Sequence, residues 1–132
     1  MDETADKLLS AARECREHAF APFSGFRVGA AVEAEDGTIF AGCNVESASY
    51  GLTMCAERVA IFSAVAAGRK RIKRISVVAE SDELTAPCGA CRQVIWEFGG
   101  DIPVLIMNTN GELVERQMSD LLPMAFDSSF LK

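Results

Sequence analysis

The sequence predicts an α/β protein, a three-layer α-β-α sandwich around a mixed five-stranded sheet. Three observations support this fold class. Helical and strand-like apolar periodicities alternate along the chain, an Asp-Gly pair separates two alternating segments near the N-terminus, and a helical segment later connects two apolar strands. A tight turn joins antiparallel strands and a helical crossover joins parallel ones, so the sheet is expected to contain both kinds of pairing.

Length and composition favour one domain. The chain has 132 residues, of which 49% are hydrophobic and 24% charged. These are ordinary values for a globular domain with a sizeable core. Since no repeat or linker divides the chain, we expect residues 1–132 to form a single domain.

The first third of the chain is predicted to contain a helix and a hairpin. Apolar residues at helical spacing predict an amphipathic helix over residues 2 to about 19, which the segment "APFSGF" ends. Alternating residues then predict two antiparallel strands, 26–35 and 38–44, joined by the Asp-Gly turn.

The rest of the chain alternates helices and strands. A very apolar helix is predicted to begin at Met54 or Cys55 and to end at Ala67, before a strand at 74–80. The elements expected after it are a helix from Cys88 to about Phe98, strands at 102–108 and 112–118, and a short helical turn with Ser119 as its N-cap.

The charge pattern argues against nucleic acid as a partner. The net charge is −6, and polyanions bind mainly through basic residues. The basic run "GRKRIKRI" at 68–75 is interpreted as a solvated connection into a strand, with a nucleic-acid or localisation patch as the alternative. No apolar run approaches the ~20 residues that span a bilayer, and the N-terminus lacks the features of a secretory signal. We therefore expect a cytoplasmic protein without membrane contact.

Three of the five cysteines are placed to bind a metal ion. Cys88 and Cys91 lie one helical turn apart at a predicted helix start, and Cys55 lies at another. Helix N-termini favour thiolates, and three thiolates suit tetrahedral zinc with one position left for water, as in catalytic zinc sites. Cys15 and Cys43 are interpreted as small buried hydrophobic residues.

Charged residues beside these cysteines complete the hypothesis of a catalytic site. Glu57, two residues after Cys55, is expected to move protons near the metal, with a helix-dipole role as the alternative. One or both of Arg58 and Arg92 are predicted to donate hydrogen bonds to the sulfurs, with ordinary surface arginines as the alternative. His18 has no companion ligand nearby and is assigned a surface or packing role.

These motifs resemble those of a known enzyme family. The run "CAE" followed by "PCGACRQ" is similar to the zinc-dependent deaminase pattern, with Cys55 in place of the histidine ligand of that pattern. Together with "APFSGFRVGAAV", "GCNVESASYG" and "LLPMAF", it resembles the small homotetrameric cytidine deaminases over nearly the whole chain. Two positions depart from the family pattern: Phe23 stands where tyrosine is common, and Met124 where glycine is common.

The resemblance implies a cytidine deaminase-like fold and a set of site residues. Cys55, Cys88 and Cys91 would hold Zn²⁺, and Glu57 would shuttle protons. The implied contacts to a nucleoside are Asn44 and Glu46 at the ribose 3′-hydroxyl, Phe26 against the pyrimidine ring, backbone groups near Ala56 at the base edge, and Phe126 in a neighbouring subunit's pocket. Roles in a strand end, a loop and the core are the alternatives for Asn44, Glu46 and Phe26.

The implied function is hydrolytic deamination of cytidine and 2′-deoxycytidine by zinc-activated water in pyrimidine salvage. The implied assembly is a homotetramer with shared active sites. One alternative is deamination of a cytosine-containing antibiotic such as blasticidin S, since such enzymes share "CAE" and "PCGxCRQ". A polynucleotide editor would need a basic strand-binding groove, and a non-catalytic zinc-binding module would need a fourth ligand.

Overall fold

A mixed five-stranded sheet forms the centre of the molecule. The computed structural model describes residues 2–131. The strands lie in the order β2-β1-β3-β4-β5, with bounds β1 Val28–Ala34, β2 Ile39–Cys43, β3 Ile72–Ala79, β4 Pro103–Met107 and β5 Leu113–Gln117. The pair β3 and β4 is parallel, and the other neighbouring pairs are antiparallel. The predicted mixed sheet is therefore confirmed.

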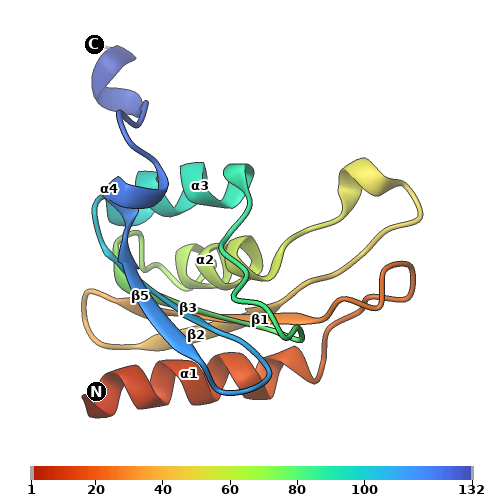
Figure 1. Ribbon diagram of the computed structural model, residues 1–132. Helices are drawn as coiled ribbons and strands as arrows, with labels where there is room; N and C mark the ends of the chain where they lie inside the picture. Colours follow the sequence, from red (N-terminus) through yellow and green to blue (C-terminus); the bar gives the residue numbers. More distant parts are fainter. Residues whose placement is uncertain (1, 132) are drawn as a thin grey trace.

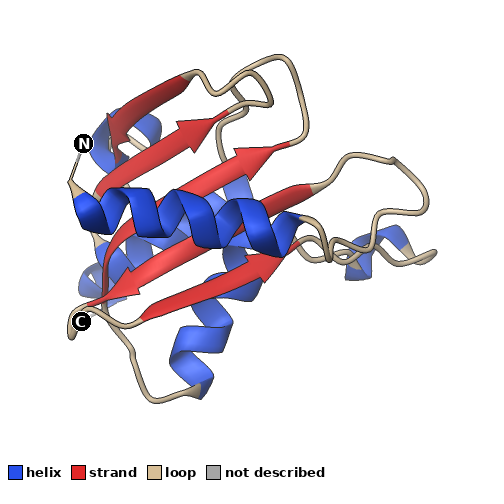
Figure 2. Ribbon diagram, turned by 90° about the horizontal axis from the view of Figure 1, so that it is seen from below, coloured by secondary structure: helices blue, strands red, loops and turns tan. Residues whose placement is uncertain are grey.

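Helices cover both faces of this sheet. Helix α1 (Glu3–Arg16) packs on one face, and α2 (Ala56–Ala66) and α3 (Gly89–Gly99) pack on the other (Figure 1). Seen from below, α1 crosses the strands as a single covering layer (Figure 2). Three short helices complete the fold: η1 (Tyr50–Leu52), α4 (Met118–Leu121) and η2 (Ser128–Leu131). This is the three-layer α-β-α arrangement that the sequence predicts.

Strand β1 lies between two apolar layers. Its side chains alternate, so Ala30 and Val32 pack in the core under α2 and α3, whereas Ala31 packs in the core under α1. It is buried on both faces because α1 covers one face of the strand and α2 the other. Small residues there allow the helices of both layers to come close to the sheet.

Gly42 on β2 shows how close that approach is. A Cβ atom at Gly42 would lie 2.4 Å from the backbone nitrogen of Ala60 and 2.8 Å from the carbonyl oxygen of Ala56. Only a residue without a side chain lets the first turns of α2 rest on the strand. The position of the α2 N-terminus therefore depends on this glycine.

Two predicted boundaries at the N-terminal end differ from the structure. Helix α1 ends at Arg16, not near residue 19, and a turn continues the chain through a hydrogen bond from the His18 N–H to the Cys15 carbonyl (2.9 Å). Strand β1 begins at Val28, not at residue 26. The Asn44 side chain makes the hydrogen bonds to the backbone where this strand begins. Its Oδ1 accepts from the Val28 N–H (2.9 Å), and its Nδ2 donates to the Phe26 carbonyl (2.8 Å).

The predicted N-cap of the last helix is wrong. Helix α4 begins at Met118, and Gln117 occupies the cap position. Ser119 lies inside the helix, where its N–H donates to the Asp101 Oδ1 (2.8 Å). An acceptor from the loop before β4 thus replaces a local serine cap, which the sequence around Ser119 could not reveal.

The basic run at 68–75 faces acidic partners. Arg69 pairs with Asp36 at 3.2 Å, and Arg74 and Lys73 pair with Glu33 at 3.2 and 3.6 Å. These ion pairs neutralise part of the run, and residues 72–75 of it belong to β3, so only residues 68–71 form the connection. Within residues 2–131, no helix has the length and apolar character needed to cross a membrane.

Candidate metal and substrate site

Three sulfurs meet where two helices begin. Cys55 is the N-cap residue of α2, Cys88 is the N-cap residue of α3, and Cys91 lies buried in the first turn of α3. Their Sγ atoms all lie within 4.8 Å of one another, and the Cys55 and Cys88 sulfurs are 3.8 Å apart. A tetrahedral zinc with Zn–S bonds of about 2.3 Å would hold sulfurs about 3.8 Å apart, so this donor set fits zinc.

Electrostatics at this point favour a thiolate. The pKa of Cys55 is lowered to about 5 by hydrogen bonds from Cys91, Arg58 and Cys88. Conversely, the hydrogen bond to Cys55 and burial raise the pKa of Cys91, so the first negative charge settles on Cys55. The unsatisfied N–H groups at both helix starts add to this preference for negative charge.

The two arginines beside the cysteines have different partners. The Arg58 Nη2 donates to the Cys55 sulfur at 3.4 Å, as the sequence predicts for at least one arginine. The Arg92 Nε and Nη1 instead donate to the carbonyls of Pro87 (2.7 Å) and Leu121 (2.9 Å). Arg92 therefore ties the start of α3 to α4, and its side chain is engaged by these carbonyls and not by the sulfurs.

Glu57 lies beside the sulfurs in a nearly closed environment. Its side chain belongs to the first turn of α2, and the residue is 5% exposed. Burial raises the pKa of Glu57 to about 7, and the charge on Cys55 acts in the same direction. A carboxyl group with such a pKa can both accept and release a proton near neutral pH.

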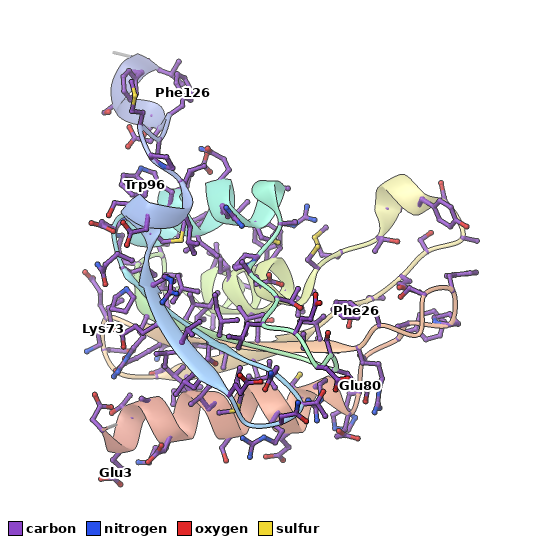
Figure 3. The ribbon with its side chains drawn as sticks, in the orientation of Figure 1. Glu3, Phe26, Lys73, Glu80, Trp96 and Phe126 are labelled. Carbon is purple, nitrogen blue, oxygen red and sulfur yellow. The ribbon has the colours of Figure 1, made fainter. Side chains whose placement is uncertain are left out.

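Glu57 and two of the sulfurs share one cavity with residues predicted to contact a nucleoside. The cavity has a volume of about 180 Å³, and its lining includes Phe26, Asn44 and Ala56 as well as Cys55, Glu57 and Cys88. Phe26 lies at the end of the sheet from which the loops at 20–26 and 45–54 extend (Figures 1 and 3). A wider hollow of about 580 Å³ beside Trp96 contains none of the sulfurs, so size alone does not locate the site.

Glu46 lies outside this cavity but next to it. It lines a neighbouring hollow of about 340 Å³, and Thr53 lines both spaces. The Glu46 Oε1 accepts from the N–H groups of Phe23 (2.9 Å) and Ser24 (3.1 Å), and the Ser24 hydroxyl donates to the Glu46 Oε2. The nucleoside contacts of Asn44 and Glu46 stay predictions, but both carry free hydrogen-bonding capacity beside the cavity.

The remaining residues singled out in the sequence lie elsewhere. Phe126 is on the C-terminal tail, far from Phe26 (Figure 3), and stacks on Phe130 with ring centroids 5.3 Å apart. Cys15 and Cys43 are half-buried and not core residues: Cys15 lies in the last turn of α1, and Cys43 ends β2, a strand at the edge of the sheet. His18 is not part of the sulfur group.

Thr53 and Ser24 are among the site residues that were missed at the level of sequence. Thr53 lines both hollows, and its hydroxyl accepts from the Ser47 N–H at 3.0 Å. The Ser24 hydroxyl accepts from the Phe26 N–H at 3.0 Å, a local serine turn. The signal for Ser24 was present, because a serine before glycine in "APFSGF" is typical of such turns, but its partner Glu46 is distant in sequence.

Comparisons with known proteins agree with this geometry. Residues 2–107 match the family model described as the cytidine and deoxycytidylate deaminase zinc-binding region. The cytidine deaminase of Sporosarcina psychrophila is 47% identical over 127 residues, which cover 96% of this chain and 93% of that protein. The crystal structure of cytidine deaminase from Burkholderia pseudomallei superposes with a TM-score of 0.88 at 50% identity, covering 96% of this chain and all of that one (100%).

A less similar relative carries another activity in its name. The blasticidin-S deaminase of Bacillus cereus is 36% identical over 107 residues, covering 75% of this chain and 76% of that protein. Its identity and coverage are both lower than those of the Sporosarcina psychrophila cytidine deaminase. Together with the trio of sulfurs at two helix starts, these matches establish that the chain belongs to the family of zinc-dependent cytidine deaminases.

Proposed function

We propose that this protein deaminates cytidine and 2′-deoxycytidine hydrolytically, giving uridine or 2′-deoxyuridine and ammonia, and that it serves pyrimidine salvage in the cytoplasm. The observation that carries the proposal is the buried Glu57 carboxyl group in the same cavity as the Cys55 and Cys88 sulfurs. The whole of residues 1–132 acts as one deaminase domain.

The chemistry divides between the metal site and Glu57. Cys55, Cys88 and Cys91 would hold zinc, which supplies the Lewis acidity that makes water nucleophilic at neutral pH. Glu57 takes a proton from the attacking water and delivers it to N3 of the cytosine ring. It then takes the second water proton from the hydroxyl group now on C4 and gives it to the amino group, so that the C4–N bond breaks, ammonia leaves and C4 becomes a carbonyl. A pKa near 7 suits both directions of transfer.

Substrate binding follows from the two adjoining hollows. The pyrimidine ring would lie between Phe26 and the first turn of α2, where the N–H of Ala56 has no acceptor within the helix. The ribose would extend past Thr53 toward Glu46. The Asn44 amide makes two hydrogen bonds to backbone, which leaves one N–H and one lone pair for a sugar hydroxyl. Because no lysine or arginine of residues 2–131 lines the cavity, a neutral nucleoside fits it better than a nucleotide.

Assay of the purified protein tests this proposal directly. Loss of ultraviolet absorbance is followed with cytidine, deoxycytidine, cytosine, CMP and blasticidin S as substrates. We expect turnover of the two nucleosides and a much lower kcat/KM for CMP and blasticidin S. A preference for CMP or for blasticidin S would refute the nucleoside assignment.

The same family membership leads us to infer a homotetramer in which Phe126 completes a neighbouring subunit's site. The support is a C-terminal tail with exposed apolar side chains: Phe126 is 56% exposed, Met124 is fully exposed, and Phe130 and Leu131 are exposed as well. Exposed apolar patches of this kind are typical of interfaces. Light scattering is expected to give four chains per particle.

Mixing two inactive variants tests whether sites are shared. Phe126→Ala removes the ring that would enter the neighbour, and Glu57→Gln removes the proton shuttle. If subunits share sites, reassembled mixtures contain intact sites, each with Glu57 from one chain and Phe126 from the other. We expect the mixture to regain activity after unfolding and refolding together. A mixture no more active than its components would contradict shared sites.

A further inference from the structure

The Ser24 hydroxyl lies between two groups that the mechanism places on the nucleoside. It donates to the Glu46 Oε2 and accepts from the Phe26 N–H at 3.0 Å. The two backbone N–H groups of Phe23 and Ser24 donate to the other Glu46 oxygen. The Ser24 side chain therefore links Glu46, in the segment after β2, to the backbone of Phe26.

The loop itself is built to hold this arrangement. The Gly25 N–H donates to the Ala21 carbonyl (2.9 Å), and Gly25 has a φ of 70°, so residues 21–25 form a single helical turn that ends in the left-handed region. The backbones of Phe20 and Val45 form a bridge that ties the start of this turn to the segment before Glu46. The turn thus presents its N–H groups and the Ser24 hydroxyl to one carboxylate.

Counting lone pairs shows what remains for a ligand. The Glu46 Oε1 accepts two N–H groups and has no further capacity. The Glu46 Oε2 accepts the Ser24 hydroxyl and keeps one lone pair. Ser24 and the turn therefore leave a single acceptor direction free on this carboxylate. A carboxylate aimed in this way loses little conformational freedom when it accepts a sugar hydroxyl.

Phe26 is held on both sides of its backbone. Its N–H donates to the Ser24 hydroxyl, and its carbonyl accepts from the Asn44 Nδ2 at 2.8 Å. Both Phe26 and Asn44 line the cavity beside the sulfurs. Loss of the Ser24 hydroxyl would remove the hydrogen bond to the Phe26 N–H and, at the same time, the hydrogen bond that orients the Glu46 carboxylate.

We propose that Ser24 is a positioning residue that orients Glu46 and Phe26 together for nucleoside binding. The inference rests on the proposed function, because it takes Glu46 and Phe26 to be the contacts of the ribose and the ring. The hydrogen bond from Ser24 is also the main cause that lowers the pKa of Glu46. Ser24 itself does not touch the reacting atoms.

Steady-state kinetics with cytidine test this role. Ser24→Ala is expected to raise KM about tenfold, the usual size for a lost hydrogen bond to a charged group, while kcat changes by less than about twofold. Ser24→Thr keeps the hydroxyl and is expected to restore most of the affinity. Ser81→Ala is the matched control, because the Ser81 hydroxyl likewise accepts from the N–H two residues on (Glu83, 3.1 Å) but lies outside the cavity.

A double-variant comparison shows whether Ser24 acts through Glu46. In a Glu46→Ala background, the rise in KM caused by Ser24→Ala is expected to shrink at least threefold, since one of its two targets is gone. An undiminished rise, or a wild-type KM for Ser24→Ala alone, would overturn the role of Ser24 and leave the proposed function intact. Failure of the wild-type chain to deaminate cytidine would refute the proposed function and this inference with it.

Discussion

At the residue scale, Glu57 lies at a helix N-terminus and is also buried, and these two surroundings act in opposite directions on its pKa. It sits in the first turn of α2, where a carboxylate is normally ionised and favoured by the helix dipole. Burial nevertheless raises its pKa to about 7. The same side chain can therefore be found in either protonation state near neutral pH, which is the requirement for moving a proton twice in one turnover.

Replacement of Glu57 by glutamine should separate proton transfer from metal binding. Glu57→Gln keeps the shape of the side chain but cannot carry a proton, so kcat/KM for cytidine is expected to fall by about 10²- to 10⁴-fold. Zinc content should stay at one ion per chain, because the three sulfurs are unchanged. Atomic absorption and the ultraviolet assay measure the two quantities. Near-native turnover in this variant would remove Glu57 from the mechanism.

Arg58 is expected to tune the metal site without binding the ion. Its hydrogen bond to the Cys55 sulfur withdraws negative charge from a donor set that would leave zinc with a net charge of −1. Arg58→Gln should therefore lower kcat/KM or zinc affinity about 10- to 100-fold, as is usual for partners of metal ligands. Arg58→Lys keeps the charge and is expected to lose less. Wild-type values for both quantities in Arg58→Gln would show that the bond is incidental.

At the scale of elements, the N-termini of α2 and α3 meet. The sequence shows that Cys55 and Cys88 each begin a helix, and the structure brings those two N-termini to within sulfur contact. This is possible because α2 packs very closely on the sheet. The contact requires glycine at position 42, since a Cβ atom there would clash with the α2 backbone. The metal site therefore depends on a glycine that contributes no atom to it.

Replacement of that glycine by alanine tests the dependence. In Gly42→Ala the new methyl group meets the α2 backbone, so the free energy of unfolding is expected to fall by about 1–3 kcal/mol, and zinc affinity should fall with it. Urea unfolding monitored by circular dichroism gives the first quantity. Gly51→Ala is the matched control, since no atom lies within 4 Å of its added Cβ. Equal stabilities of the two variants would contradict the tight seating.

The metal site connects two helices at the scale of the whole molecule. Helices α2 and α3 pack on the same face of the sheet, and an ion held by Cys55, Cys88 and Cys91 would cross-link their N-termini. A ligand that binds only the folded state stabilises it by mass action. The ion is therefore expected to contribute to stability as well as to chemistry.

Removal of zinc should lower the melting temperature. A chelator is expected to reduce Tm by about 10 °C, the shift that corresponds to a few kcal/mol of binding free energy in a chain of this size. His18→Ala keeps all three sulfurs and should show the same shift, whereas Cys88→Ser should show little or none. Differential scanning calorimetry gives these values. An unchanged Tm on chelation of the wild-type protein would argue against a bound ion.

Local patterns were enough to predict the order and type of the main elements. The Asp36-Gly37 turn pairs β1 with β2 as expected, and the helix between β3 and β4 produces a parallel pair. Boundaries failed where a distant side chain supplied the hydrogen bond, as Asp101 does for Ser119 and Asn44 does for Val28. Such partners are separated in sequence, so periodicity and capping preferences contain no information about them.

The sequence by itself determined that three cysteines and a glutamate lie at the starts of two helices. Spacing within one turn of a helix is a local property, and it places Cys88 near Cys91 and Glu57 near Cys55 whatever the rest of the chain does. Only the tertiary structure decided that the two helix starts meet, that Arg92 turns away from the sulfurs, and that Ser24 joins Glu46 to Phe26. These contacts arise because the sheet order and the close packing of α2 on β2 bring together segments that are far apart along the chain.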